Sequence, residues 1–317
     1  MYLLPSRCVS VKKDGSNGVS EVSYIMLEII EELHVLQPGN SVHISSKTPD
    51  RFLKEACKVI RQWHGYPSIF NPDIYIQEML RQGKSIEDAR EGGCSGCIEV
   101  GAFGKEAYIL TGYLNVPKII EITLNNGMNP VTSKQVSIET GNPRDFKSYE
   151  ALYDAFKTQL NYIVNQKILV SNYIDRMFAK YSPATFLSVV IEDCITKGKD
   201  YYNGGPRYNT NYIQCTGLGT VTDSLATLKK HVFEDKTVTM DTLLNAVSTN
   251  FEGAAILRQT ILNKTPFYGN DNDYADTIAL QVYNDLFDAI DGKPNTKGET
   301  FHLNMLSTTC HVYFGKI

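Results

Sequence analysis

The stretch that decides the fold runs from Arg90 to Tyr113 and reads REGGCSGCIEVGAFGKEAYILTGY. Within thirteen residues of it stand five glycines, Gly92, Gly93, Gly96, Gly101 and Gly104. Such density is unfavourable inside a helix or strand, so it predicts a tight loop with unusual backbone angles. Cys97 and Glu99 are two residues apart, and in an extended segment both side chains leave the same side of the chain. We therefore expect a sulfur and a carboxylate that face one space, surrounded by the rest of the chain.

Length and composition exclude several classes of protein. The chain has 317 residues, of which 42% are hydrophobic, enough for a packed core in one large domain or two smaller ones. Its net charge of −4 gives no reason to expect a nucleic-acid partner or an anionic membrane. No apolar run approaches the roughly 20 residues that a membrane helix needs, and the N-terminus turns polar too soon for a signal peptide. Seven scattered cysteines favour free thiols in a reducing cytosol, so we expect a cytoplasmic protein.

Helical periodicity dominates the chain and leaves room for a few short strands. It predicts helices over residues 22–36, 48–63, 72–82, 85–90, 116–125, 148–180, 222–232, 240–263 and 271–291. The longest of these is expected to break once, near Val170 and Ser171. Short strands are expected over residues 41–46 and at the end of the chain, where Cys310, Val312 and Phe314 alternate.

Three further stretches lack a clear period. Residues 128–146 read as polar turns, residues 183–194 as a buried helix or strand, and residues 197–211 as a second polar, glycine-rich loop. Because no internal repeat or linker is evident, the residues alone predict a fold of the α/β or mainly α class.

Cys94 and Cys97 fit the C-x-x-C pattern, which has three interpretations. A thiol–disulfide redox pair requires one cysteine at a helix N-terminus, where its pKa is lowered. Half of a zinc site requires a second pair, and the sequence contains no second C-x-x-C. The third interpretation is a turn that holds two buried thiols.

Two motifs resemble ligand-binding loops but depart from them. Gly217-Leu-Gly219 is part of a dinucleotide-binding pattern without its third glycine, so it predicts a helix capped near residues 222–223. Asp271-Asn-Asp273 resembles the start of a calcium loop, but the later glycine and glutamate are missing. Asn270 and Asp271 are therefore expected to be helix caps.

Two basic residues have open interpretations. Arg207 follows a Gly-Gly-Pro turn, and a buried arginine there is costly unless it pairs with another group. A structural role and a role near a substrate both remain open for it. His302 is isolated in sequence, which predicts a core or edge residue with satisfied hydrogen bonds rather than a metal ligand.

At Gly96-Cys97-Ile98-Glu99 the sequence resembles the cysteine loop of the glycyl radical enzymes, the pyruvate formate-lyase-like superfamily. The resemblance extends over the whole stretch 88–113 and covers nearly the whole chain, from about Val22. Other matching segments are the Gly-Gly-x-Arg-Tyr-Asn pattern within 198–209, Gly-Thr-Val-Thr-Asp-Ser-Leu at 219–225, and Thr-Thr-Cys-His-Val-Tyr-Phe-Gly at 308–315. Because the segments occur in the family's order, together they are far more specific than any one of them.

The resemblance implies an α/β fold that is part of a ten-stranded α/β barrel, with the cysteine loop inside and helices outside. Residues 1–317 would form a single partial barrel domain. The family's radical-bearing glycine, in an Arg-Val-x-Gly loop near the C-terminus, has no match in this chain. The chain is therefore expected to be an internal fragment that cannot make or hold the radical alone.

The resemblance also implies roles for individual residues. Within the family, the motifs are most similar to those of members that dehydrate trans-4-hydroxy-L-proline to 1-pyrroline-5-carboxylate, which makes the activity that of a carbon–oxygen lyase. Cys97 would become the thiyl radical and Glu99 the acid/base that helps the hydroxyl leave as water. Tyr113 and Thr308 stand where that subgroup contacts its substrate, and Val100 stands where glycerol and choline-lyase relatives have proline. Ser307 departs from an expected proline.

By resemblance, no cofactor or metal is bound directly. A glycyl radical, installed by a radical S-adenosylmethionine activating enzyme, would start the reaction, and the enzyme would be a homodimer with a small-molecule substrate and without nucleic-acid or membrane partners. Two alternatives stay open. One is another glycyl radical chemistry, such as diol dehydration, arylacetate decarboxylation or formate acetyltransfer, and the other is a non-catalytic scaffold.

Overall fold

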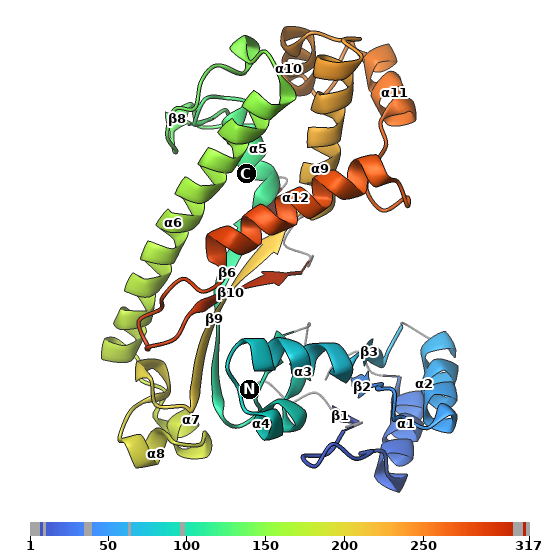
Figure 1. Cartoon of the computed structure of the whole chain (residues 1–317), viewed down its shortest axis with the longest axis vertical. Helices are drawn as coiled ribbons and strands as arrows, with labels where there is room; N and C mark the ends of the chain where they lie inside the picture. Colours follow the sequence, from blue (N-terminus) through green and yellow to red (C-terminus); the bar gives the residue numbers. More distant parts are fainter. Residues whose placement is uncertain are drawn as a thin grey trace. The chain divides into compact units, whose positions relative to one another are not determined.

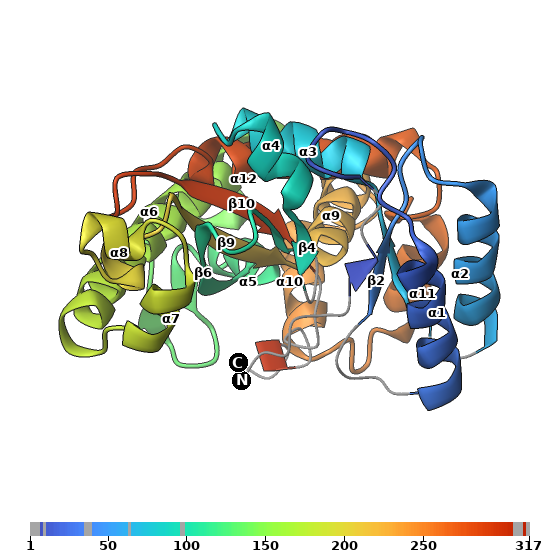
Figure 2. The ribbon, with the colours of Figure 1, turned by 90° about the horizontal axis from the view of Figure 1, so that it is seen from below.

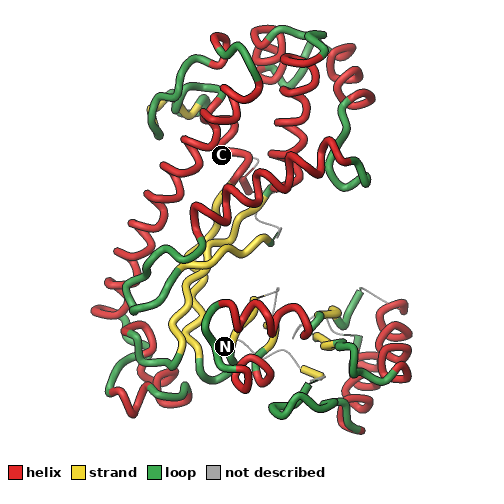
Figure 3. The backbone as a smooth tube through the Cα atoms, in the orientation of Figure 1, coloured by secondary structure: helices red, strands yellow, loops and turns green. Residues whose placement is uncertain are grey.

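The computed structural model describes residues 7–8, 11–34, 40–62, 65–95, 99–306 and 313–314 (Figure 1). Helices make up most of the regular structure and strands a smaller share, as Figure 3 shows, so the mixed α/β class is confirmed. The chain divides into two compact units, Met1–Tyr108 with Ala179–Thr210 and Ile109–Phe178 with Asn211–Ile317. We call them the first and second unit and describe each by itself. A single barrel domain over residues 1–317 stays a prediction.

The first unit starts with a three-stranded parallel sheet in the order β1-β2-β3. Its strands are Arg7–Cys8 (β1), Ser41–His43 (β2) and Ser68–Phe70 (β3), and its helices are Glu21–Leu33 (α1) and Asp50–Gln62 (α2). Parallel neighbours need a crossover connection, which the helices provide. Leu27, Val42 and Phe52 are fully buried where α1, β2 and α2 pack together.

The remainder of the first unit carries the cysteine stretch. Two helices lead into it, and three short helical pieces come from the later part of the unit: Pro72–Arg81 (α3), Ile86–Glu91 (α4), Thr185–Val190 (α7), Cys194–Lys197 (α8) and the 3₁₀ turn Tyr201–Asn203 (η2). α3 begins at a proline in its first turn, with the Asn71 side chain accepting from the Asp73 amide at 2.9 Å. Ser85 caps α4 in the same way, through the amide of Asp88 at 3.1 Å. Asparagine and serine before helical periodicity thus explain both helix starts.

The second unit is organised around a sheet in the order β10-β9-β6 (Figure 2). Its strands are Glu106–Asn115 (β6), Tyr208–Thr216 (β9) and Phe301–Met305 (β10), and the unit boundaries fall within β6 and β9. β10 runs parallel to β9, with Phe301 opposite Asn211 and Met305 opposite Cys215. β9 is the central strand, so its residues are buried almost throughout.

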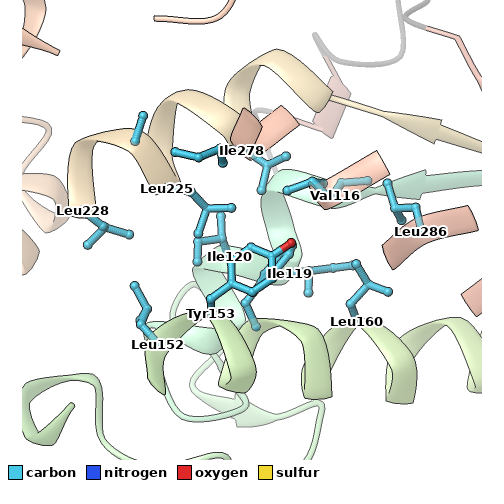
Figure 4. Packing of buried hydrophobic residues seen from close by; sticks show 14 of the residues in the cluster. Val116, Ile119, Ile120, Leu152, Tyr153, Leu160, Leu225, Leu228, Ile278 and Leu286 are labelled. Atoms are coloured by element: carbon cyan, nitrogen blue, oxygen red, sulfur yellow. The ribbon is translucent and has the colours of Figure 1, made fainter. Parts of the chain in front are cut away.

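Helices surround a large apolar core in the second unit. They are Val116–Thr123 (α5), Tyr149–Tyr181 (α6), Leu218–Thr227 (α9), the π-helical segment Leu228–Glu234 (η3), Met240–Ser248 (α10), Ala255–Lys264 (α11) and Asp273–Ile290 (α12). Smaller elements are Met128–Asn129 (β7), Lys134–Gln135 (β8) and Pro143–Asp145 (η1). Figure 4 shows Leu152, Tyr153 and Leu160 of α6 turned towards α5, with Leu225 of α9 and Ile278 of α12 packed in the same cluster. The i, i+4 and i+8 spacing of apolar residues on α6 produces this contact.

Several predictions about helices need correction. α6 continues unbroken through Val170, because Ser171 and Asp175 are buried on one face of the same helix. The stretch predicted as one helix over 240–263 is two, α10 and α11, separated by a turn in which Asn250 and Phe251 have φ of 51° and 60°. Residues 183–194 contain the helix α7, but it is not buried, since Phe186 is 84% exposed.

Most of β6 and the start of β9 fall in the stretches predicted as loops, 90–113 and 197–211, and there the prediction is wrong. β9 is central but rich in polar residues, which are buried because they have specific partners: Asn211 donates to Asp175 at 2.7 Å, and Gln214 donates to the carbonyl of Leu306 at 3.2 Å. Paired polar side chains remove the apolar alternation by which a strand is recognised. The strand predicted at the end of the chain is wrong at Phe314, which is helical, while Cys310 and Val312 lie outside the described residues.

Candidate active site

The cysteine stretch forms an antiparallel hairpin of Gly93–Ser95 (β4) and Glu99–Gly101 (β5). Gly93 pairs with Gly101, Cys94 with Val100, and Ser95 with Glu99. Glu99 is half-buried at the start of β5. Cys97 stands between the two strands in sequence and lies outside the described residues, so its placement beside Glu99 stays a prediction.

The glycines of the hairpin serve close packing more than unusual backbone angles. Gly92, Gly93 and Gly101 all have ordinary φ. Gly104, the other described glycine of this stretch, has a positive φ of 73°. A Cβ on Gly92 would lie 2.5 Å from the carbonyl oxygen of Gly101, and one on Gly93 would lie 2.7 Å from Cε1 of His43. The predicted reason for the glycine density is therefore wrong at these positions, where a side chain has no room.

Cys94 is a buried cysteine on β4 and is not part of a disulfide. It packs in a small apolar cluster with Tyr75, Met79 and Ala89. Burial among apolar side chains is typical of an inert structural cysteine. The redox pair with Cys97 stays a prediction, because Cys97 lies outside the described residues.

Tyr113 lies on β6 in the second unit and is 42% exposed. Its ring is 6.3 Å from that of Phe314, in an edge-to-face arrangement. The preceding Gly112 has φ of 93°, and the Nζ of Lys167 donates to the carbonyl of Thr111 at 2.9 Å. Gly112 therefore places a left-handed backbone conformation, which favours glycine, directly before Tyr113. Thr308, the other predicted substrate contact, lies outside the described residues.

In the second unit, Lys167 is half-buried and Cys215 is buried. Burial lowers the pKa of Lys167 and raises the pKa of Cys215 to about 12, with the Lys167 charge slightly opposing the latter change. A thiol of that pKa is protonated at neutral pH. Cys215 therefore acts as a small apolar residue of the core.

An ion-pair network beside the hairpin was not predicted as a unit. The carboxylate of Asp88 lies 2.6 Å from Nζ of Lys105 and 3.1 Å from Nη1 of Arg207, and it accepts from the hydroxyl of Tyr208 at 2.8 Å. Burial by itself would raise the pKa of Asp88, but hydrogen bonds from these three residues outweigh it and lower the pKa to about 2. Asp88 is thus charged at any physiological pH.

Arg207 also reaches two other carboxylates. Its Nη2 lies 2.7 Å from Glu192, and its Nε lies 3.3 Å from Asp193. Its side chain is 37% exposed rather than buried, and its charge is fully paired. Of the two roles left open by the sequence, these contacts favour the structural one. In the sequence, only Arg207 indicated the network, because a buried arginine after the Gly-Gly-Pro turn would need a charged partner.

The two stretches that resemble ligand-binding loops both lead into helices, whose caps differ from the predicted ones. α9 begins at Leu218, with Gly217 as N-cap at φ of 86°, so the predicted cap near residues 222–223 is wrong. α12 is capped by Asn272, whose side chain accepts from the amide of Tyr274, rather than by Asn270 or Asp271. Among the described residues, no three His, Cys, Asp or Glu side chains are grouped to hold a metal ion.

His302 is a satisfied core residue, as predicted. It is buried, and its Nδ1 lies 2.8 Å from a carboxylate oxygen of Asp291. Within the described part of the chain, no helix combines the length and the apolar character that crossing a membrane requires.

Comparisons with known proteins agree with the resemblance. A family model described as pyruvate formate lyase-like matches residues 10–315. The trans-4-hydroxy-L-proline dehydratase of Clostridioides difficile is 51% identical over 307 residues, which cover 97% of this chain and 39% of that protein. The (2S)-3-sulfopropanediol dehydratase of Klebsiella oxytoca is 30% identical, with 96% of this chain and 37% of that protein covered.

A solved structure is also similar. The crystal structure of hydroxyproline dehydratase from Clostridioides difficile, with trans-4-hydroxy-L-proline bound, matches 98% of this chain with a TM-score of 0.94 and 50% identity. The match covers 39% of that structure's chain. This chain therefore spans less than two fifths of the length of the curated relatives described here.

Proposed function

Because the chain belongs to the pyruvate formate lyase-like family, we propose that it is the cysteine-hairpin part of a glycyl radical dehydratase that acts on trans-4-hydroxy-L-proline. The observation that carries the proposal is the 51% identity to the hydroxyproline enzyme over 97% of this chain. The Gly-Cys-Ile-Glu order at residues 96–99 supports it, since it places a thiol and a carboxylate two residues apart.

We assign Cys97 as the hydrogen-atom abstractor and Glu99 as the acid. The S–H bond of Cys97 forms as a C–H bond of the substrate breaks, and a proton from Glu99 lets the adjacent hydroxyl leave as water. A proton of the substrate then passes to the Glu99 carboxylate and restores the acid, and return of the hydrogen atom from the thiol restores the Cys97 radical, so the net reaction is loss of one water without oxidation or reduction. Proton transfer by a positioned carboxylate contributes about 10²–10⁴-fold to such a step.

The family's glycyl radical would supply the initial hydrogen-atom abstraction, installed by a radical S-adenosylmethionine activating enzyme. The described residues support this proposal, because the hairpin packs against a buried apolar cluster around Cys94. Tyr113 has 42% of its surface available for a ligand, and we propose that it and Thr308 contact the substrate. A homodimer in the cytoplasm completes the proposal.

The test uses the natural-length protein, activated without oxygen and supplied with trans-4-hydroxy-L-proline. We expect 1-pyrroline-5-carboxylate, trapped and measured by absorbance, with Cys97→Ser inactive and Glu99→Gln slower by about 10²-fold or more. Cys94→Ser is the matched control, because it changes a neighbouring thiol that we assign no chemical role. Electron paramagnetic resonance of each variant separates failed activation from failed turnover. Turnover by Cys97→Ser at the parent rate would contradict the assignment.

A diol substrate is the second candidate, favoured by the 30% identity to the sulfopropanediol dehydratase. The same assay with (2S)-3-sulfopropanediol and glycerol decides between them. A kcat/KM higher for either diol than for hydroxyproline would refute the proposed substrate while leaving the reaction class intact.

A further inference from the structure

The buried residues Lys84 and Glu106 form an ion pair beside the cysteine hairpin. We infer that this pair positions the hairpin strand that carries Glu99, an inference that rests on the proposed function. The Nζ of Lys84 lies 3.2 Å from Oε1 of Glu106, a charge contact without hydrogen-bond geometry. The two side chains are 1% and 2% exposed. Both residues belong to the first unit, as does the whole hairpin.

The carboxylate of Glu106 holds the end of β5 directly. Its Oε2 accepts a hydrogen bond from the backbone amide of Ala102 at 2.7 Å. Ala102 follows the last residue of β5 and stands three residues after Glu99. A charged acceptor makes this bond stronger than one between neutral groups. The bond therefore fixes the strand close to the proposed acid.

Glycines let the backbone come within reach of this carboxylate. A Cβ on Gly101 would lie 3.0 Å from Oε2 of Glu106, and a Cβ on Gly92 would lie 2.5 Å from the carbonyl oxygen of Gly101. The end of β5 is thus enclosed by Glu106 on one side and by the residue before β4 on the other. A side chain at Gly92 would require the backbone of the hairpin to move, and one at Gly101 would require the Glu106 carboxylate to shift.

Lys84 is itself held in one place. Its Nζ donates to Oε1 of Gln82 at 2.6 Å and lies 5.7 Å from the ring centroid of Tyr208. Its amide donates to the carbonyl of Met79 at 3.1 Å. Removing two charges from water costs free energy that their attraction only partly returns, so such a pair is poor evidence for stability alone. Instead, the pair holds the charged carboxylate of Glu106 in one position beside the end of β5.

The cysteines of the chain are built-in probes of this role. Cys94 is buried on β4 and 5% exposed, Cys194 is buried elsewhere in the first unit at 2%, and Cys57 is exposed. A buried thiol reacts with iodoacetamide only when its surroundings open. Loosening of the hairpin alone exposes Cys94, whereas unfolding of the unit exposes Cys94 and Cys194 together.

The experiment measures alkylation of each cysteine by mass spectrometry in a Cys97→Ser background of this chain. In Lys84→Met we expect Cys94 to react about tenfold faster or more, because Glu106 is left buried without its cation. Cys194 and Cys57 should keep their parent rates. Lys84→Arg should restore Cys94 to within about threefold of the parent, since it returns the charge. Arg81→Met, which breaks an exposed pair with Glu78, is the matched control.

Two results would overturn the inference. One is an unchanged Cys94 rate in folded Lys84→Met, and the other is equal acceleration at Cys94 and Cys194, which indicates a general structural role. If Lys84→Met fails to fold, Glu106→Gln decides, because it keeps the size and the acceptor for Ala102 and removes only the charge. Hydrogen exchange of the segment 93–101 should then quicken without a change in the rest of the unit. None of these readouts requires turnover, so an inactive enzyme would refute the proposed function and leave this inference standing.

Discussion

Asp88→Asn tests the ion-pair network beside the hairpin. The carboxylate of Asp88 is 6% exposed and is surrounded by Lys105, Arg207 and Tyr208. Asparagine has the same shape and resembles the protonated acid, so the substitution removes the charge with little change in packing. The variant therefore isolates the electrostatic part of what Asp88 contributes to the fold.

The magnitude follows from the pKa of Asp88. That pKa falls from an ordinary 3.8 to about 2 in the folded chain. The ionised form therefore stabilises the fold by about 2.4 kcal/mol at pH 7. Because the folded pKa is the lower one, this stabilisation is present above pH 3.8 and is lost as the pH falls through about 2. It should be about 1.3 kcal/mol at pH 3 and about 0.4 kcal/mol at pH 2.

The assay is urea denaturation of parent and variant, followed by circular dichroism at pH 7 and pH 3. We expect the free energies of unfolding to differ by about 2.4 kcal/mol at pH 7 and by about half of that at pH 3. Glu78→Gln, in an exposed pair with Arg81, is the control and should cost about 0–0.5 kcal/mol. A difference that is the same at both pH values, or below about 0.5 kcal/mol at pH 7, would refute the reasoning.

Three further predictions concern the second unit. Gly112→Ala should lower the free energy of unfolding by about 1–3 kcal/mol, because φ is 93° at this position. Gly219→Ala, at ordinary φ, is the control and should not lower it. Thermal unfolding of both variants checks this prediction. Lys297→Met should cost about 3–5 kcal/mol in urea denaturation, because it leaves Asp175 buried without the cation that lies 2.7 Å away; a loss under about 1 kcal/mol would contradict it. Burial lowers the pKa of His231 below 6.5, so the neutral form is favoured in the fold and stability should fall as the pH drops below 6.5. His231→Gln should flatten that part of the curve of melting temperature against pH, and an unchanged slope would count against the assignment.

Helices were predictable because their signals are local. Apolar residues at helical spacing predicted α1, α2 and α12 to within a few residues, and Asn71 and Ser85 are the caps that begin α3 and α4. Errors arose where a local pattern was ambiguous. The turn between α10 and α11 has left-handed backbone at Asn250, Phe251 and Gly253, and the helical spacing of apolar residues on both sides outweighed the signal of that one glycine.

The candidate site was predictable in part. The order of Cys97 and Glu99 in a glycine-rich stretch, together with the other matching segments, indicated the family, and the family model matches residues 10–315. The hairpin pairing of Ser95 with Glu99 was not foreseen, nor was the support that Glu106 gives to Ala102. Both are contacts between residues whose separation in the sequence follows neither the helical nor the strand periodicity, so no sequence pattern indicated them.

The amino-acid sequence by itself determined the helical segments and the family, because both are written in short-range patterns and ordered motifs. Tertiary structure decided which polar residues are buried. Lys84, Asp175 and Asn211 look like surface residues in sequence, yet each is buried because a partner of matching charge or hydrogen-bonding capacity lies beside it. The same applies to Gly92 and Gly101, whose missing side chains make room for a backbone and a carboxylate brought close only by folding. Such pairings arise from three-dimensional packing, and a buried charge is tolerated only where that packing supplies its partner.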